Sequence, residues 1–139
     1  MPTSRTRAAN RVLWTAQVLV ALLFLFAGSM KFIMPAEKMQ QGPIVFPLAF
    51  MYFIGFCECL GALGLILPAA TRIRTELTPL AAAGLTIIMI GATTVSIMSM
   101  GAAAGIVPAV VGMITTAIAY GRTRVAPVTS APRRALRTA

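Results

Sequence analysis

Residues 77–121 read LTPLAAAGLTIIMIGATTVSIMSMGAAAGIVPAVVGMITTAIAYG and contain no charged side chain over 45 positions. A helix that crosses a lipid bilayer needs about 20 apolar residues at a rise of about 1.5 Å per residue. The run is therefore long enough for two crossings. It predicts membrane spans over residues 77–98 and 102–120, with the turn between them near Gly101.

Two further spans precede this run. Between Arg11 and Lys31 lie 19 uncharged residues, and between Lys38 and Arg72 the only charge is Glu58. These stretches predict spans over residues 12–34 and 47–68. Only 11% of the 139 residues are charged and 58% are hydrophobic, whereas soluble domains are about 25% charged. The sequence thus predicts an all-α integral membrane protein, a bundle of four helices over residues 12–120.

The basic residues predict the orientation of the bundle. With four spans, the N-terminal tail (1–11), the link between the second and third spans, and the C-terminal tail (121–139) share one side of the membrane. Ten of the twelve basic residues lie in these segments. Because cytoplasmic loops are enriched in Lys and Arg, we expect both termini to be cytoplasmic. The C-terminal tail is rich in Pro, Ser, Thr and Arg and is expected to be disordered. The net charge of +9 flanks the apolar body, which argues against nucleic acid as a partner.

Small residues are expected where helices pack, because lipid supplies no hydrophobic force between helices and close backbone approach must replace it. The third span carries two glycines seven positions apart, on one face, and the fourth begins with a small-xxx-small element. The glycines assigned to helix packing are Gly28, Gly55, Gly61, Gly84, Gly91, Gly101 and Gly105.

Lys31 and Glu58 are charges of opposite sign on consecutive spans. A charge in hydrocarbon costs several kcal/mol, roughly 2.5–3.5 on insertion scales, so it is normally paired or functional. Three interpretations stay open for this pair. It fixes the register of two helices, it binds the polar head of a lipophilic ligand, or Glu58 exchanges protons. Helical spacing places Lys31 on one face of the first span with Gln17, and we expect that face to oppose the one that carries Glu58 and Gly55.

Four uncharged polar side chains are candidates for lining the same site. They are Gln17, Thr93, Thr94 and Ser96, and three of them lie about midway along the third span. Hydroxyl groups can bond to carbonyls of their own helix, so most hydroxyl side chains in the spans need no partner.

No catalytic or metal-binding arrangement is found. Cys57 and Cys59 flank Glu58, and residues two apart on a helix point about 200° from each other, which excludes an unstrained disulfide. The chain has no histidine, so no ordinary zinc or haem site is expected. These features favour a non-enzymatic role.

Two motifs carry a family resemblance. FLFAGSMKF (residues 24–32) has the pattern F-x-x-A-G-x-x-K-F, and GFCECLGALGL (residues 55–65) has the pattern G-x-x-E-x-x-G-x-x-G-L. They resemble the first and second helices of the DoxX-like membrane proteins over a region of about residues 12–120. The resemblance implies an accessory or binding role, since the family is linked to subunits of quinone-coupled oxidoreductases, a maturation factor for amine-oxidising enzymes, and assembly chaperones.

We therefore expect a multi-pass protein of the bacterial inner membrane that holds a quinone- or lipid-like molecule in a cavity near Lys31 and Glu58. A quinone is the candidate cofactor. A membrane oxidoreductase, another membrane protein or a second copy is the candidate partner. Two alternatives are a proton-coupled small multidrug-type transporter and a membrane assembly chaperone.

Overall fold

The structure, a computed structural model, describes residues 4–130, and helices are the only regular secondary structure within that range. The elements in chain order are α1 (Ser4–Ile33), α2 (Ala36–Met39), α3 (Leu48–Thr71), α4 (Leu77–Met100), the 3-10 helix η1 (Ala102–Gly105), α5 (Ile106–Tyr120) and the π-helical turn η2 (Gly121–Val125). Four helical segments are long and apolar enough to cross a membrane. The prediction of an all-α, four-span chain is confirmed.

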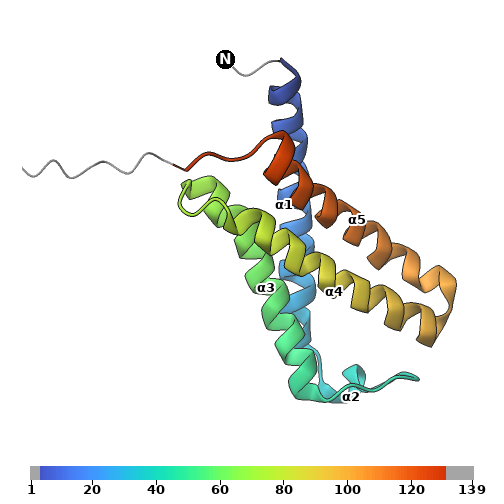
Figure 1. The fold of residues 1–139 in the computed structure, drawn as a ribbon. Coiled ribbons are helices and arrows are strands. Elements are labelled where there is room, and N and C mark those ends of the chain that lie inside the picture. The colour runs from blue at the N-terminus through green and yellow to red at the C-terminus, as the bar shows by residue number, and fades with distance from the viewer. Residues whose placement is uncertain (1–3, 131–139) are drawn as a thin grey trace, which may run out of the picture.

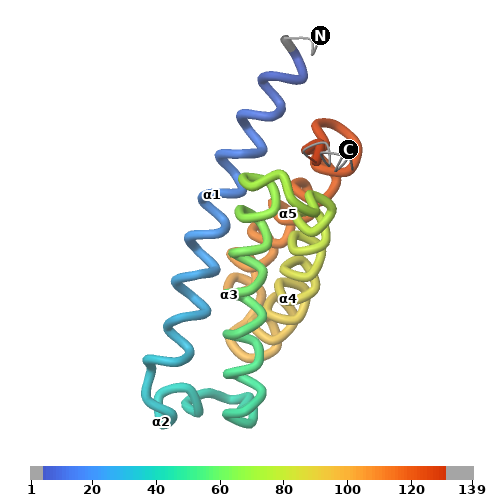
Figure 2. The backbone as a smooth tube through the Cα atoms, turned by 90° about the vertical axis from the view of Figure 1, so that its left-hand side faces the viewer, coloured from blue at the N-terminus to red at the C-terminus, as the bar shows by residue number. Residues whose placement is uncertain are grey.

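The helices form two antiparallel pairs. α1 and α3 lie side by side along much of their length, and α4 and α5 form a hairpin that turns at Gly101 (Figure 1). α3 also packs against α4, but the hairpin crosses the first pair obliquely, so its turn lies away from the lower ends of α1 and α3 (Figures 1 and 2). The start of α1, the α3–α4 link and the segment after η2 lie at one end of the bundle, and α2 lies at the other.

The faces of the first two spans meet as expected. Gln17 and Phe24 on α1 and Glu58 and Leu65 on α3 are all buried. Most other large apolar side chains point outward, which suits a surface surrounded by lipid. The core is consequently small and consists of Val20, Ala21, Phe24, Ala62, Leu65, Ala82, Leu85, Met89 and Ile118.

The glycines fall into two groups. A Cβ placed on Gly28 would lie 2.7 Å from the carbonyl oxygen of Gly55, and one on Gly61 would lie 2.6 Å from Leu85 Cδ2. Gly105 has Ile97 equally close. At Gly28 the obstacle is backbone, so only glycine fits, whereas at Gly61 and Gly105 a Cβ would displace a packed side chain of the neighbouring helix.

Gly84 and Gly91 differ from the prediction, because a Cβ at either would meet nothing within 4 Å. They border open cavities between α3 and α4, whereas Ala82, Leu85 and Met89 supply the packed face. Gly101 is equally open, and its φ of 91° shows that it serves the turn of the hairpin, where a glycine is favoured.

Several helix ends differ from the predicted spans. α1 begins at Ser4, because the polar residues before Arg11 contain no helix breaker. α3 continues through Pro68 to Thr71 and ends at Arg72, whose φ is 56°. Helical structure also extends past Tyr120 to Val125, within the segment expected to be disordered. The tail positions 131–139 lie outside the described residues.

Candidate functional site: an ion pair beside an apolar cavity

The structure brings Lys31 and Glu58 into direct contact. Lys31 Nζ donates to Glu58 Oε2 over 2.6 Å, and the two side chains are 22% and 5% exposed. α1 and α3 run antiparallel, and side chains lean toward the N-terminus of their own helix, so these two lean toward each other. The glycine contact at Gly28 and Gly55 lies directly beside the pair and brings the helices close enough for it to form.

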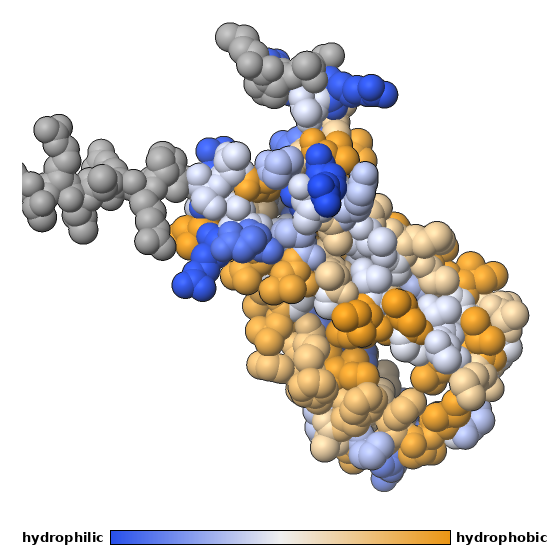
Figure 3. All heavy atoms as spheres, viewed as in Figure 1, coloured by the Kyte–Doolittle hydropathy of each residue, from blue (hydrophilic) through white to orange (hydrophobic). Residues whose placement is uncertain are grey.

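A cavity of about 590 Å³ opens beside this pair. Its walls come from α3, from α4 and from the connection between α1 and α3, and Figure 3 shows the surface hollowed there between orange, apolar residues. Its volume lies within the usual range for a small-molecule site. The lining residues are Lys31, Met39, Ile44, Phe46, Phe50, Met51, Phe53, Ile54, Glu58, Ile87, Ile88, Gly91, Ala92, Val95 and Ser96.

The connection between α1 and α3 takes part in this site. It carries one short helix, α2, and its residues Met39, Ile44 and Phe46 line the cavity. The cavity therefore lies toward the end of the bundle at which Lys31 sits, and it is not enclosed at the centre of the four helices.

Of the four predicted polar lining residues, only Ser96 lines the cavity. Thr93 and Thr94 donate to the carbonyls of Met89 and Ile90 on their own helix, at 2.7 and 2.9 Å, and they border a different groove, between α4 and α5. Gln17 lies about four helical turns from Lys31 along α1, at the opposite end of the bundle. The depth of a residue along its helix was predictable, but the direction of the side chain around the helix was not.

A second polar cluster was missed by the sequence analysis. Arg122, which had been assigned to the tail, is only 3% exposed, and its Nε donates to Gln17 Oε1 at 2.5 Å. Its Nη1 donates to Asn10 Oδ1 at 2.7 Å, and Gln17 Nε2 in turn donates to the carbonyl of Leu65 at 2.5 Å. The cluster ties α1, α3 and η2 together. One feature of the sequence could have predicted this cluster. Gln17 is a polar residue on the packed face of α1, and a buried amide needs hydrogen-bond partners.

A third polar contact joins the two helices of the hairpin. The hydroxyls of Thr86 on α4 and Thr115 on α5 are 2.8 Å apart. One hydroxyl donates in this contact and the other donates to a carbonyl of its own helix, Ala82 for Thr86 or Gly112 for Thr115, so neither hydroxyl proton is left unpaired.

Four apolar helices of membrane-crossing length, with a charged pair held between two of them, define a small multi-pass membrane protein. The chain belongs to the DoxX-like family, whose sequence profile matches residues 15–119. The resemblance predicted from the two motifs is thereby confirmed. No curated protein and no solved structure was found to match the chain.

Proposed function

We propose that this chain is an accessory protein of the bacterial inner membrane that holds a quinone- or lipid-like molecule in the cavity beside Lys31 and Glu58. The observation that carries the proposal is the combination of a largely apolar cavity with one ammonium–carboxylate pair on its wall. Such a site offers an apolar surface for a lipophilic body and a few polar groups that fix its orientation.

The residues present fit a quinone. An ammonium group has three donors, and Lys31 uses one of them on Glu58, so two others can serve a carbonyl oxygen. Phe46, Phe50 and Phe53 line the cavity and offer faces and edges to a ring. A bound quinone supplies two-electron redox chemistry, and this chain's part is to bind and orient it.

The proposed role includes an association with a membrane oxidoreductase that exchanges electrons with the held molecule. The chaperone alternative shares the need for a protein partner and differs in needing no small molecule. The pairing of Glu58 with Lys31 counts against the proton-coupled transporter, because a carboxylate already neutralised by an ammonium group is a poor proton carrier.

The test is to fill the cavity. Gly91 lines it and has open space at its Cβ, so Gly91→Leu directs an apolar side chain into the cavity. Gly84 lies on the same helix and is equally open, and it lines the adjoining groove between α3 and α4 instead of this cavity, which makes Gly84→Leu the matched control. A short-chain quinone is titrated calorimetrically against the full chain in mild detergent, and natural quinone is extracted from each purified variant and quantified.

We expect Gly91→Leu to weaken binding about 5- to 150-fold, since one overpacked side chain costs about 1–3 kcal/mol, and Gly84→Leu to keep it. Lys31→Met should weaken binding as well. The proposal fails if the parent chain takes up no quinone or lipid, or if both leucine variants lose it equally. Stable co-purification of a membrane protein without any small molecule would favour the chaperone.

A further inference from the structure

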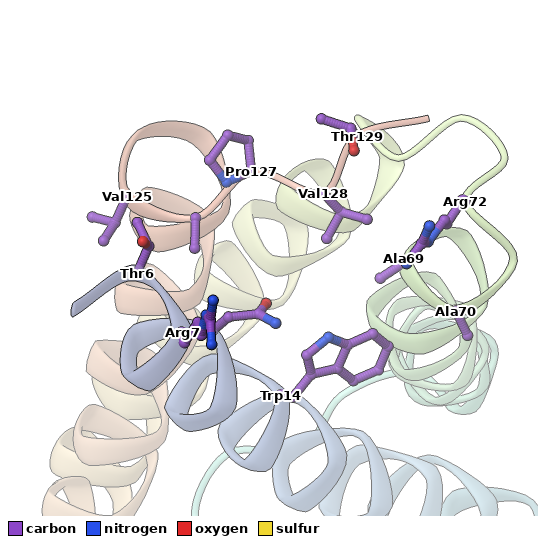
Figure 4. A pocket seen from close by; sticks show the side chains of 12 residues that line it. Thr6, Arg7, Trp14, Ala69, Ala70, Arg72, Val125, Pro127, Val128 and Thr129 are labelled. Atoms are coloured by element: carbon purple, nitrogen blue, oxygen red, sulfur yellow. The ribbon is translucent and has the colours of Figure 1, made fainter. Parts of the chain in front are cut away.

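A second cavity lies at the opposite end of the bundle, where the two ends of the described chain meet. It measures about 480 Å³. The first turns of α1 supply Arg7, Asn10 and Trp14, the end of α3 supplies Arg72, and the segment after η2 passes across it (Figure 4). Nothing in the proposed function uses this cavity.

The walls of this cavity carry positive charge and hydrogen-bond donors. Arg7 and Arg72 both line it, and neither forms an ion pair within the described residues. The chain has three acidic residues, and none of them lines the cavity. The indole nitrogen of Trp14, a donor only, lies on the edge of the ring that faces the cavity in Figure 4.

A buried guanidinium lies beneath the floor. Arg122 Nη1 donates to Asn10 Oδ1 and, at 3.1 Å, to the carbonyl of Ala126, and both of these residues line the cavity. Its Cζ lies 5.4 Å from the centre of the Trp14 ring. Its Nη2 is buried with no hydrogen-bond partner among the described residues. Because no carboxylate compensates this cation, an anion in the cavity would lower the cost of burying it.

The cavity is built by specific contacts on both sides. Arg122 fixes Asn10 through its carbonyl oxygen, which leaves the amide NH2 of Asn10 available as a further donor. Across the cavity, the hydroxyls of Ser130 and Thr75 are 3.1 Å apart, which attaches the segment after η2 to the α3–α4 link. Different hydrogen bonds therefore hold the two sides of the cavity, one at Asn10 on α1 and one between Ser130 and Thr75.

We propose that this cavity binds a phosphate group, supplied by the head of an anionic phospholipid. Guanidinium groups match phosphate oxygens in pairs, and basic pockets between helices on the cytoplasmic side are suited to anionic headgroups. The cavity lies at the end of the bundle that carries most of the arginines, where headgroups of the cytoplasmic leaflet are expected. The proposal does not depend on the quinone site at the other end.

Trp14 is the only tryptophan of the chain and lines the cavity, so its fluorescence reports on an occupant. The full chain in mild detergent is titrated with dihexanoyl phosphatidylglycerol, with dihexanoyl phosphatidylcholine, and with inorganic phosphate. The test variant is Arg7→Gln/Arg72→Gln. The matched control, Arg5→Gln/Arg124→Gln, removes the same charge from exposed arginines that do not line the cavity.

We expect a saturable change in emission with phosphatidylglycerol and none with phosphatidylcholine. The Arg7→Gln/Arg72→Gln variant should weaken the response about 30-fold, and the control variant less than about threefold. An equal response to inorganic phosphate at the same concentration supports the phosphate chemistry and overturns the lipid as its source. Equal responses to both lipids, no response at all, or equal weakening in the two variants would overturn the site.

Discussion

At the scale of single residues, Gln17 is a completely buried amide whose hydrogen bonds connect three helical elements. Both polar atoms of its amide are used, since Nε2 donates to the Leu65 carbonyl and Oε1 accepts from Arg122. The side chain is completely buried, so neither partner can turn to water if the amide is removed. One amide therefore joins three helical elements.

Replacing Gln17 by Leu keeps the volume and removes both bonds. Two buried groups, Arg122 Nε and the Leu65 carbonyl, lose their partners, and we expect the free energy of unfolding to fall by about 2–4 kcal/mol. Unfolding in mixed micelles by sodium dodecyl sulfate, followed by circular dichroism, measures it. Thr15→Val is the control, because Thr15 is exposed and its hydroxyl bonds only to its own helix. Equal losses in the two variants would contradict a role for the cluster.

The Lys31–Glu58 pair could be predicted from the sequence, whereas the cluster around Arg122 could not, and the difference has a physical reason. Lys31 and Glu58 stand out because the cost of charge in hydrocarbon makes each conspicuous, and helix spacing limits where they lie. Arg122 follows the end of an apolar run, where exposed arginines are ordinary. Its burial depends on the π-helical turn and on partners more than 100 residues earlier, which no local pattern specifies.

At the scale of helices, contact between backbones decides which pairs form. Gly28 and Gly55 place α1 against α3, and Gly61 receives Leu85 from α4. Composition predicted that glycines would mediate packing, but could not say which face of α4 is covered. The spacing of Gly84 and Gly91 is that expected of a helix-packing face, but in the structure a Cβ at either position would contact nothing.

Gly55→Ala and Gly84→Ala separate these two situations. A Cβ at Gly55 would lie 3.0 Å from the Gly28 carbonyl oxygen, so α1 and α3 must move apart, and we expect a loss of about 1–3 kcal/mol. At Gly84 the Cβ meets nothing, so the change should be neutral or stabilise by up to about 1 kcal/mol. The same micelle assay compares them. A loss at Gly84 as large as that at Gly55 would show that α4 is covered by another protein surface.

At the scale of the whole molecule, the oblique hairpin produces the cavity, and an even number of crossings gathers the arginines at one end. The number of spans followed directly from hydropathy and length. The cavity did not, because it depends on the crossing angle between the two helix pairs and on the path of residues 34–47.

Topology is testable with single cysteines in a chain whose native Cys57 and Cys59 are replaced by Ala. Gln41 follows α2 and Thr129 follows η2, both are exposed, and these two segments lie at opposite ends of the bundle (Figure 1). We expect a membrane-impermeant maleimide to label Gln41→Cys in intact spheroplasts and Thr129→Cys only after lysis, because the enrichment in arginine predicts that the end carrying Thr129 is cytoplasmic. Labelling of both before lysis, or the reverse pattern, would contradict the orientation.

The most direct test of the central claim, that Lys31 and Glu58 are one ion pair held between α1 and α3, is a charge exchange. Lys31→Glu and Glu58→Lys each place like charges together, and each should destabilise the fold by about 3–5 kcal/mol. The unfolding free energy of the double variant Lys31→Glu/Glu58→Lys is the decisive measurement. We predict that it recovers at least half of the summed loss. A double variant as unstable as the sum of the two single variants would contradict the pairing.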